Sequence, residues 1–236
     1  MTASQERWTV RVGDATTSAR YEPADPGPEV GLFVCAHGAG GSMDDRGTAA
    51  AARSMRRVGL GVVRFNFLYK EQRSGRPDPM PRLIECFSAV VDHARSACGV
   101  AGARLLIGGR SMGGRAASMM AADGFDCAGL MLFAYPLHPA GQPDKLRTAH
   151  LPKIDVPVLC FNGTRDALCR KDLMEAAVAT VRAPWTMHWL EGADHSFHVL
   201  KSSGRTDAEI MHEVEAATSR WLESVLPSVT TGHLTS

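Results

Sequence analysis

The chain has 236 residues, of which 44% are hydrophobic and 22% are charged, and its formal net charge is +1. These values are ordinary for a water-soluble globule with a sizeable core. A near-zero net charge without a long basic run argues against a direct nucleic-acid partner. The polar N-terminus and the lack of a long apolar run argue against a secretory signal and a membrane partner, so we expect a cytoplasmic protein.

The six cysteines and nine histidines show no metal-binding spacing. No two cysteines form a Cys-x-x-Cys pair, and Cys35 and Cys160 lie in apolar runs where a thiol packs as a small apolar side chain. We therefore expect reduced cysteines and no metal site.

Short apolar runs alternate with stretches of helical spacing along most of the chain. The expected strands are 8–12, 30–36, 61–67, 104–107, 128–133, 157–161 and 185–190. The expected helices are 46–58, 82–98, 112–122, 173–181 and 210–225. This alternation predicts a mostly parallel sheet with helices on both faces, in which ligands bind at the carboxyl ends of the strands.

Two stretches are expected to be irregular. Residues 69–81 are polar and broken by prolines, which predicts a loop. Residues 135–155 also contain several prolines and form the longest segment without a periodic pattern. A loop of that length inside a compact domain is usually functional, so we expect it to cover a pocket as a short lid.

The string Gly109-x-Ser111-x-Gly113 lies between an apolar run and a stretch of helix formers. This context is typical of a nucleophile elbow, a sharp strand-to-helix turn that lifts a serine hydroxyl over the sheet edge. Small neighbours are needed because larger side chains would collide with the turn. The alternative is an ordinary glycine-rich turn.

A serine hydroxyl needs a base to take its proton and an acid to orient that base. After Ser111, the chain places Asp166 and then His195 in turns that follow expected strands, which is the order serine, acid, histidine. The alternatives are a structural turn aspartate at 166 and different choices of acid or base. These other candidates are Asp155, Asp172, His188 and His198.

An oxyanion hole would complete this site. The backbone N–H of Met112 follows the nucleophile, and we expect the second donor to be Ala39 in the glycine-rich turn 37–41. The alternatives for this turn are a simple chain reversal or a phosphate cradle, but it lacks the P-loop ending and the dinucleotide-binding spacing.

Several polar residues near these turns are candidates for substrate contact. We expect Arg110, His37 and Gly40 to contribute to substrate binding. Arg115 and the run 201–205 could also receive an anionic group, although such residues more often form ion pairs or a solvated face.

Four strings together resemble a small α/β-hydrolase family related to dienelactone hydrolases. They lie at 37–41, at 108–115, at 135–139, and at 194–197 together with 201–205. Animal relatives of that family include a testis-expressed protein and subunit 3 of the NSL chromatin complex. The resemblance covers residues 30–226 and implies an α/β-hydrolase fold, capless or with a short lid loop. We expect one domain over 1–226 and a flexible tail over 227–236. The resemblance also implies triad positions for Ser111, Asp166 and His195.

Two functions are compatible with these residues. The first is a serine hydrolase that cleaves a small ester, thioester or related acyl compound through an acyl-enzyme, without a cofactor. The second is a non-catalytic protein-interaction module that keeps the fold. A lactone substrate does not follow from the resemblance, because typical dienelactone hydrolases place a cysteine where this chain has Ser111.

Overall fold

The computed structural model describes residues 4–226, in which eight strands form one sheet of order β1-β2-β4-β3-β5-β6-β7-β8. The strands are β1 (Glu6–Val12), β2 (Ala15–Glu22), β3 (Gly31–Ala36), β4 (Leu60–Phe65), β5 (Leu105–Arg110), β6 (Gly129–Phe133), β7 (Val158–Gly163) and β8 (Trp185–Leu190). The strands from β4 to β8 in this order are parallel, and β1 and β2 are antiparallel additions at one edge. The expected tail at 227–236 lies outside the described residues.

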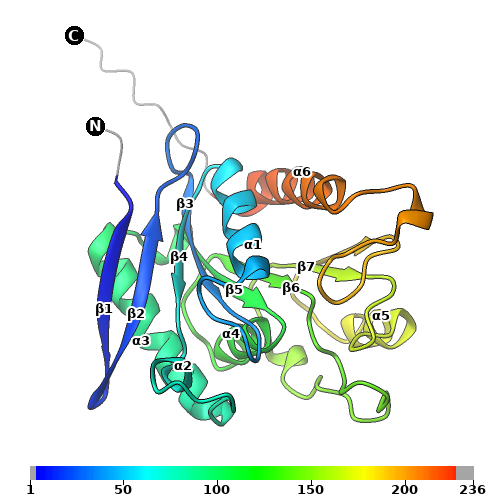
Figure 1. Cartoon of the computed structure of the whole chain (residues 1–236), viewed down its shortest axis with the longest axis horizontal. Coiled ribbons are helices and arrows are strands. Elements are labelled where there is room, and N and C mark those ends of the chain that lie inside the picture. Colours follow the sequence, from blue (N-terminus) through cyan, green and yellow to red (C-terminus); the bar gives the residue numbers. More distant parts are fainter. Residues whose placement is uncertain (1–3, 227–236) are drawn as a thin grey trace.

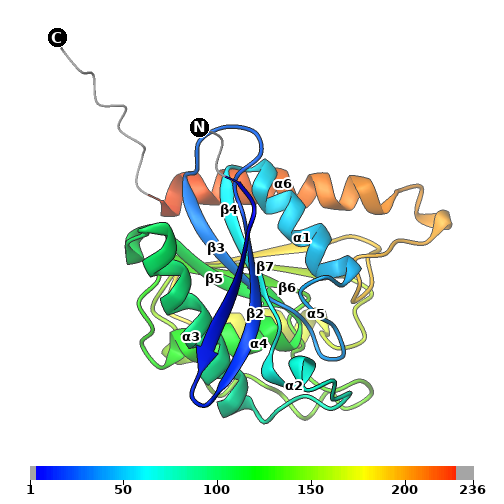
Figure 2. The same ribbon diagram turned by 60° about the vertical axis from the view of Figure 1, so that its left-hand side comes forward.

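Helices cover both faces of the sheet, as the alternation in the sequence predicts (Figures 1 and 2). The α-helices are α1 (Arg46–Arg57), α2 (Leu68–Glu71), α3 (Met80–Cys98), α4 (Met112–Ala122), α5 (Lys171–Val178) and α6 (Asp207–Val225). Helices α1 and α6 pack on one face, and α3, α4 and α5 pack on the other. The central strands β3, β4, β6 and β7 are buried along their whole length, which explains their continuous apolar runs.

Two elements are missing from the sequence prediction. Strand β2 was not expected, because its sequence ATTSARYE is largely polar. Every second residue of it from Thr17 is nevertheless buried, and it pairs with both β1 and β4. The short helix α2 lies where a loop was expected. None of the helices in the described chain is both long and apolar enough to span a bilayer.

The crossover from β6 to β7 contains only a short 3-10 helix, Leu151–Lys153. Its two ends are fixed to the domain. The N–H of Tyr135 donates to Asn162 Oδ1 of β7 (3.2 Å), and His150 Nε2 lies 2.8 Å from the Ser118 hydroxyl of α4. Residues 140–146 include most of its exposed positions, so a lid movement would have to come from this turn.

The turn between β5 and α4 is tightly packed against the end of β3. A Cβ built on Gly109 would lie 2.2 Å from the carbonyl oxygen of Ala36, and one on Gly113 would lie 2.6 Å from the same oxygen. No side chain fits at these separations, so both glycines are needed for α4 to start directly above β3.

We expect Gly113→Ala to lower the free energy of unfolding by about 1–3 kcal/mol, because the added methyl group forces β3 and α4 apart. Urea unfolding measures this change. Gly75→Ala is the matched control, since a Cβ at Gly75 meets no atom within 4 Å. Equal stability of the two variants would contradict the packing argument.

His150 gives the fold a pH dependence. Burial, and then the neighbouring Arg115, lower the pKa of His150 from 6.5 to about 4. The unfolded chain therefore binds a proton at a pH where the folded chain does not, and the free energy of unfolding decreases as the pH falls from about 6.5 towards 4. In urea titrations over this range, His150→Gln should show a shallower decrease than the wild type. His212→Gln, which removes an exposed histidine of α6, should leave the decrease unchanged.

Candidate active site

Ser111 has a strained backbone between β5 and α4. Its φ of 46° and ψ of −113° lie in a region that residues other than glycine rarely adopt. Hydrogen bonds on both sides hold this conformation. The N–H of Ser111 donates to the carbonyl of Phe133 (2.9 Å), and its carbonyl accepts from the N–H of Arg115 (3.0 Å). The hydroxyl consequently stands at the carboxyl edge of the sheet, as expected for an elbow.

Ser111, His195 and Asp166 form a continuous chain of hydrogen bonds. His195 Nε2 lies 3.0 Å from Ser111 Oγ, and His195 Nδ1 lies 2.8 Å from Asp166 Oδ2. A carboxylate can only accept, so Nδ1 of the neutral ring donates to Asp166 and Nε2 is left to accept the serine proton. The three side chains come from the turns after β5, β7 and β8.

The side chain of Asp166 is fully buried, and two further hydrogen-bond donors hold it in place. The Asn162 amide donates to Oδ2 (3.1 Å), and the N–H of Leu168 donates to Oδ1 (2.8 Å). Asn162 itself exchanges hydrogen bonds with the N–H and carbonyl of Tyr135. Sequence reasoning did not single out Asn162. The available signal was a polar residue at the end of the buried strand β7.

The alternative acids and bases lie elsewhere. Asp172 pairs with Arg170 on the surface, and Asp155 precedes β7 at the opposite edge of the sheet. The two alternative bases also have partners of their own. His188 pairs with Glu213, and His198 pairs with Asp207.

The glycine-rich turn 37–41 passes directly beside Ser111. A Cβ on Gly38 would lie 3.5 Å from the Ser111 Cβ, and the N–H of Gly41 donates to the carbonyl of Gly38 (3.1 Å). This turn leaves Ala39 and Gly40 exposed at its tip. Within residues 4–226, neither the N–H of Ala39 nor that of Met112 donates a hydrogen bond, so both are free for a ligand.

His37 has a different place from the one expected for a substrate contact. Its side chain is completely buried, with Nδ1 2.8 Å from the carbonyl of Gly38 and Nε2 accepting from the N–H of Phe67 (3.2 Å). Burial lowers its pKa, which keeps the ring neutral. No polar atom of His37 is left for a substrate, because both nitrogens hold the backbone of the turn and its neighbour.

Arg110 points away from the serine towards the face covered by α1. A Cβ on Gly47 of α1 would lie 2.9 Å from Arg110 Nε. The guanidinium donates from Nη2 to the carbonyl of His195 (3.0 Å) and lies 5.2 Å from the centre of the Phe197 ring. Arg110 therefore supports the loop that bears the histidine.

The remaining candidate residues are the run 201–205, the cysteines and the possible metal ligands. Arg205 of the run 201–205 pairs with Glu213. All six cysteines are free thiols. Across residues 4–226, no group of three histidine, cysteine, aspartate or glutamate side chains is placed to hold a metal ion.

Solved structures with the same arrangement of strands and helices include three bacterial proteins. A serine hydrolase without a lid from Xanthomonas campestris is 19% identical, with a TM-score of 0.73 over 97% of this chain and 98% of its own. A dienelactone hydrolase from Anabaena variabilis is 18% identical, with a TM-score of 0.72 over 95% of this chain and 99% of its own. A serine hydrolase homologue from Coxiella burnetii is 19% identical, with a TM-score of 0.72 over 92% of this chain and 97% of its own.

At these identities the likeness shows the fold alone, and it confirms the expected α/β-hydrolase fold with a mostly parallel central sheet. The sequence itself matches the family model described as "Alpha/beta hydrolase domain" over residues 29–223. Because this match extends over most of the chain, the protein belongs to the α/β-hydrolase family.

Proposed function

We propose that this protein is a serine hydrolase that cleaves a small ester, thioester or related acyl compound through an acyl-enzyme on Ser111. The observation that carries the proposal is the unbroken contact from Ser111 Oγ to His195 Nε2 (3.0 Å) and from His195 Nδ1 to the buried Asp166 (2.8 Å). The strain at Ser111 supports it further, because backbone strain of this kind is concentrated at functional sites.

In the first step, Ser111 Oγ attacks the acyl carbon while His195 Nε2 takes the hydroxyl proton. The carbonyl electrons move to oxygen, and the resulting oxyanion accepts hydrogen bonds from the N–H groups of Met112 and Ala39. Each such donor contributes about 3 kcal/mol to the stability of the transition state. The bond to the leaving group then breaks, and His195 gives its proton to that group.

In the second step, His195 removes a proton from water as the water attacks the acyl carbon. The bond between that carbon and Ser111 Oγ then breaks, the acid leaves, and His195 returns its proton to Ser111 Oγ. Asp166 keeps the ring in the correct tautomer and stabilises its positive charge. Asn162 and the Leu168 N–H hold Asp166 in place, and His37 holds the oxyanion turn. We assign positioning roles to Asn162 and His37.

The candidate active site is accessible from solvent. The His195 side chain is 32% exposed, so the triad opens to solvent instead of lying under a cap. The exposed tip at Ala39 and Gly40 leaves room above Ser111, and we retain Gly40 as a candidate substrate contact. A single domain over 1–226, a cytoplasmic location and a closer relationship to the testis-expressed and NSL proteins stay predictions.

A fluorophosphonate probe tests the proposal. The wild type should gain one phosphonyl adduct in intact-protein mass spectrometry, and Ser111→Ala should gain none, because only an activated serine reacts. Ser224→Ala, which removes a serine from the end of α6, should label like the wild type. A folded wild type that does not label would contradict the hydrolase and favour the interaction module.

The support of the histidine loop by Arg110 can be measured separately. In Arg110→Met the carbonyl of His195 loses its donor, and we expect amide hydrogen exchange in 194–199 to accelerate roughly tenfold and probe labelling to slow. Arg165→Met is the control, since Arg165 also donates to a carbonyl, that of Gly192 (3.0 Å), in a neighbouring turn. Equal acceleration in both variants would remove the specific role of Arg110.

A further inference from the structure

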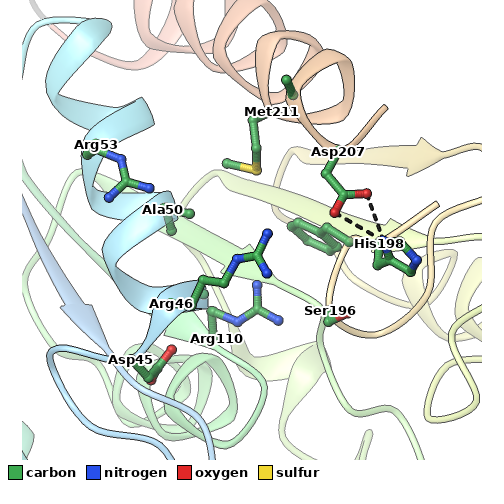
Figure 3. A pocket seen from close by; sticks show the side chains of 13 residues that line it. Asp45, Arg46, Ala50, Arg53, Arg110, Ser196, His198, Asp207 and Met211 are labelled. Atoms are coloured by element: carbon green, nitrogen blue, oxygen red, sulfur yellow. Dashed lines mark hydrogen bonds and ion pairs between the residues drawn. The ribbon is translucent and has the colours of Figure 1, made fainter. Parts of the chain in front are cut away.

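A pocket of about 740 Å³ lies between α1, α6 and the loop at 196–198 (Figure 3). Neither Ser111 nor His195 lines it. It is separated from the triad by Arg110, whose backbone precedes the serine and whose side chain turns to the α1 face. The pocket therefore lies beside the candidate active site and is not part of it.

Three arginines direct their side chains into this pocket. Arg46 and Arg53 come from the same side of α1, and Arg110 enters from the end of β5 (Figure 3). The guanidinium groups of Arg46 and Arg110 lie side by side in this view. Two elements that are distant in sequence thus supply the arginines of the pocket, and Arg53 lies further along α1 than the other two (Figure 3).

Three arginines and two aspartates line the pocket, so the acidic residues offset only part of its positive charge. Asp207 is paired with His198 (3.0 Å), and Asp45 caps α1 by accepting from the N–H and hydroxyl of Thr48 (2.8 and 2.9 Å). Asp45 attracts Arg110 through space, and Asp207 attracts Arg46 in the same way. In the described part of the chain, the arginines at 46, 53 and 110 form no ion pair.

The arginines are placed against local preferences. Arg46 is the first residue of α1, where the positive end of the helix dipole opposes a cation, and the first turn contains no acidic residue. Burial lowers the pKa of Arg110, and its guanidinium packs closely against the backbone of Gly47, where a Cβ would lie 2.9 Å from Nε. An anion in the pocket would add to the partial compensation that the N-cap residue Asp45 provides.

Apart from Ser196 and His198, the remaining wall of the pocket is apolar. Phe197 lies under the Arg110 guanidinium, and Met211 of α6 and Ala50 of α1 face the same space (Figure 3). A free inorganic ion would leave this surface in water. The lining therefore matches a ligand with an anionic head and an apolar body.

We propose that this pocket binds the phosphate monoester group of a small molecule whose remainder is apolar. Guanidinium groups bind phosphate oxygens through paired N–H donors, and a tetrahedral dianion offers oxygens to several of them at once. A carboxylate is satisfied by a single guanidinium. The proposal does not depend on turnover at Ser111, although Arg110 connects the pocket to the carbonyl of His195.

Isothermal titration calorimetry of the full chain with phenyl phosphate tests this site. Phenyl phosphate should bind more tightly than benzoate, which carries a carboxylate, and more tightly than inorganic phosphate, which lacks the apolar part. Arg46→Gln and Arg53→Gln should each weaken binding about tenfold, the effect of losing one charged hydrogen-bond donor. Both side chains are exposed on α1, so the variants should remain folded.

Two control variants locate the ligand. Arg220→Gln removes an exposed arginine of α6 that does not line the pocket, and Ser111→Ala removes the candidate nucleophile. Both should bind phenyl phosphate like the wild type. Loss of binding in Ser111→Ala would place the ligand at the candidate active site and overturn the proposal. Unchanged binding in the Arg46 and Arg53 variants, or benzoate binding as tightly as phenyl phosphate, would overturn it as well.

Discussion

The site depends on one constraint, which is the close approach of the backbones of β3, β5 and α4 at the elbow. The first turn of α4 lies so near the end of β3 that a Cβ at Gly113 would be 2.6 Å from the carbonyl of Ala36. This contact fixes where α4 begins and forces Ser111 into its positive φ of 46°. Strain of this kind costs about 1–3 kcal/mol and persists only when the surrounding structure enforces it. Buried strands on both sides of β5 provide that enforcement.

The same packing places the partners of Ser111. Parallel strands end at one edge of the sheet, so the turns after β7 and β8 deliver Asp166 and His195 to the edge where β5 ends. The strand order also brings these turns close together, because β5, β6, β7 and β8 are consecutive neighbours in the sheet. The geometry of the candidate triad is thus a property of the sheet as much as of the three side chains.

This is why much of the fold and of the candidate site could be predicted from the sequence. Strands buried on both faces have continuous apolar runs, and residues that follow them must meet at one edge. Strand β2 could not be found in this way, since only alternate residues of it are buried and its other face is polar. Asn162 was missed because its importance lies in contacts with Tyr135 and Asp166, which periodicity does not reveal.

Arg110 shows most clearly which contacts the sequence does not predict. A residue next to the nucleophile in sequence is naturally expected to contact substrate, but alternation along β5 turns its side chain to the opposite face from α4. There it joins Arg46 and Arg53, which belong to a helix more than fifty residues earlier in the chain. One guanidinium consequently contacts the loop of His195 and the wall of the pocket. An anion bound to Arg110 would change the hydrogen bond that holds the His195 loop without contacting Ser111. The Arg110 side chain therefore links the pocket on the α1 face to the candidate triad at the carboxyl edge of the sheet.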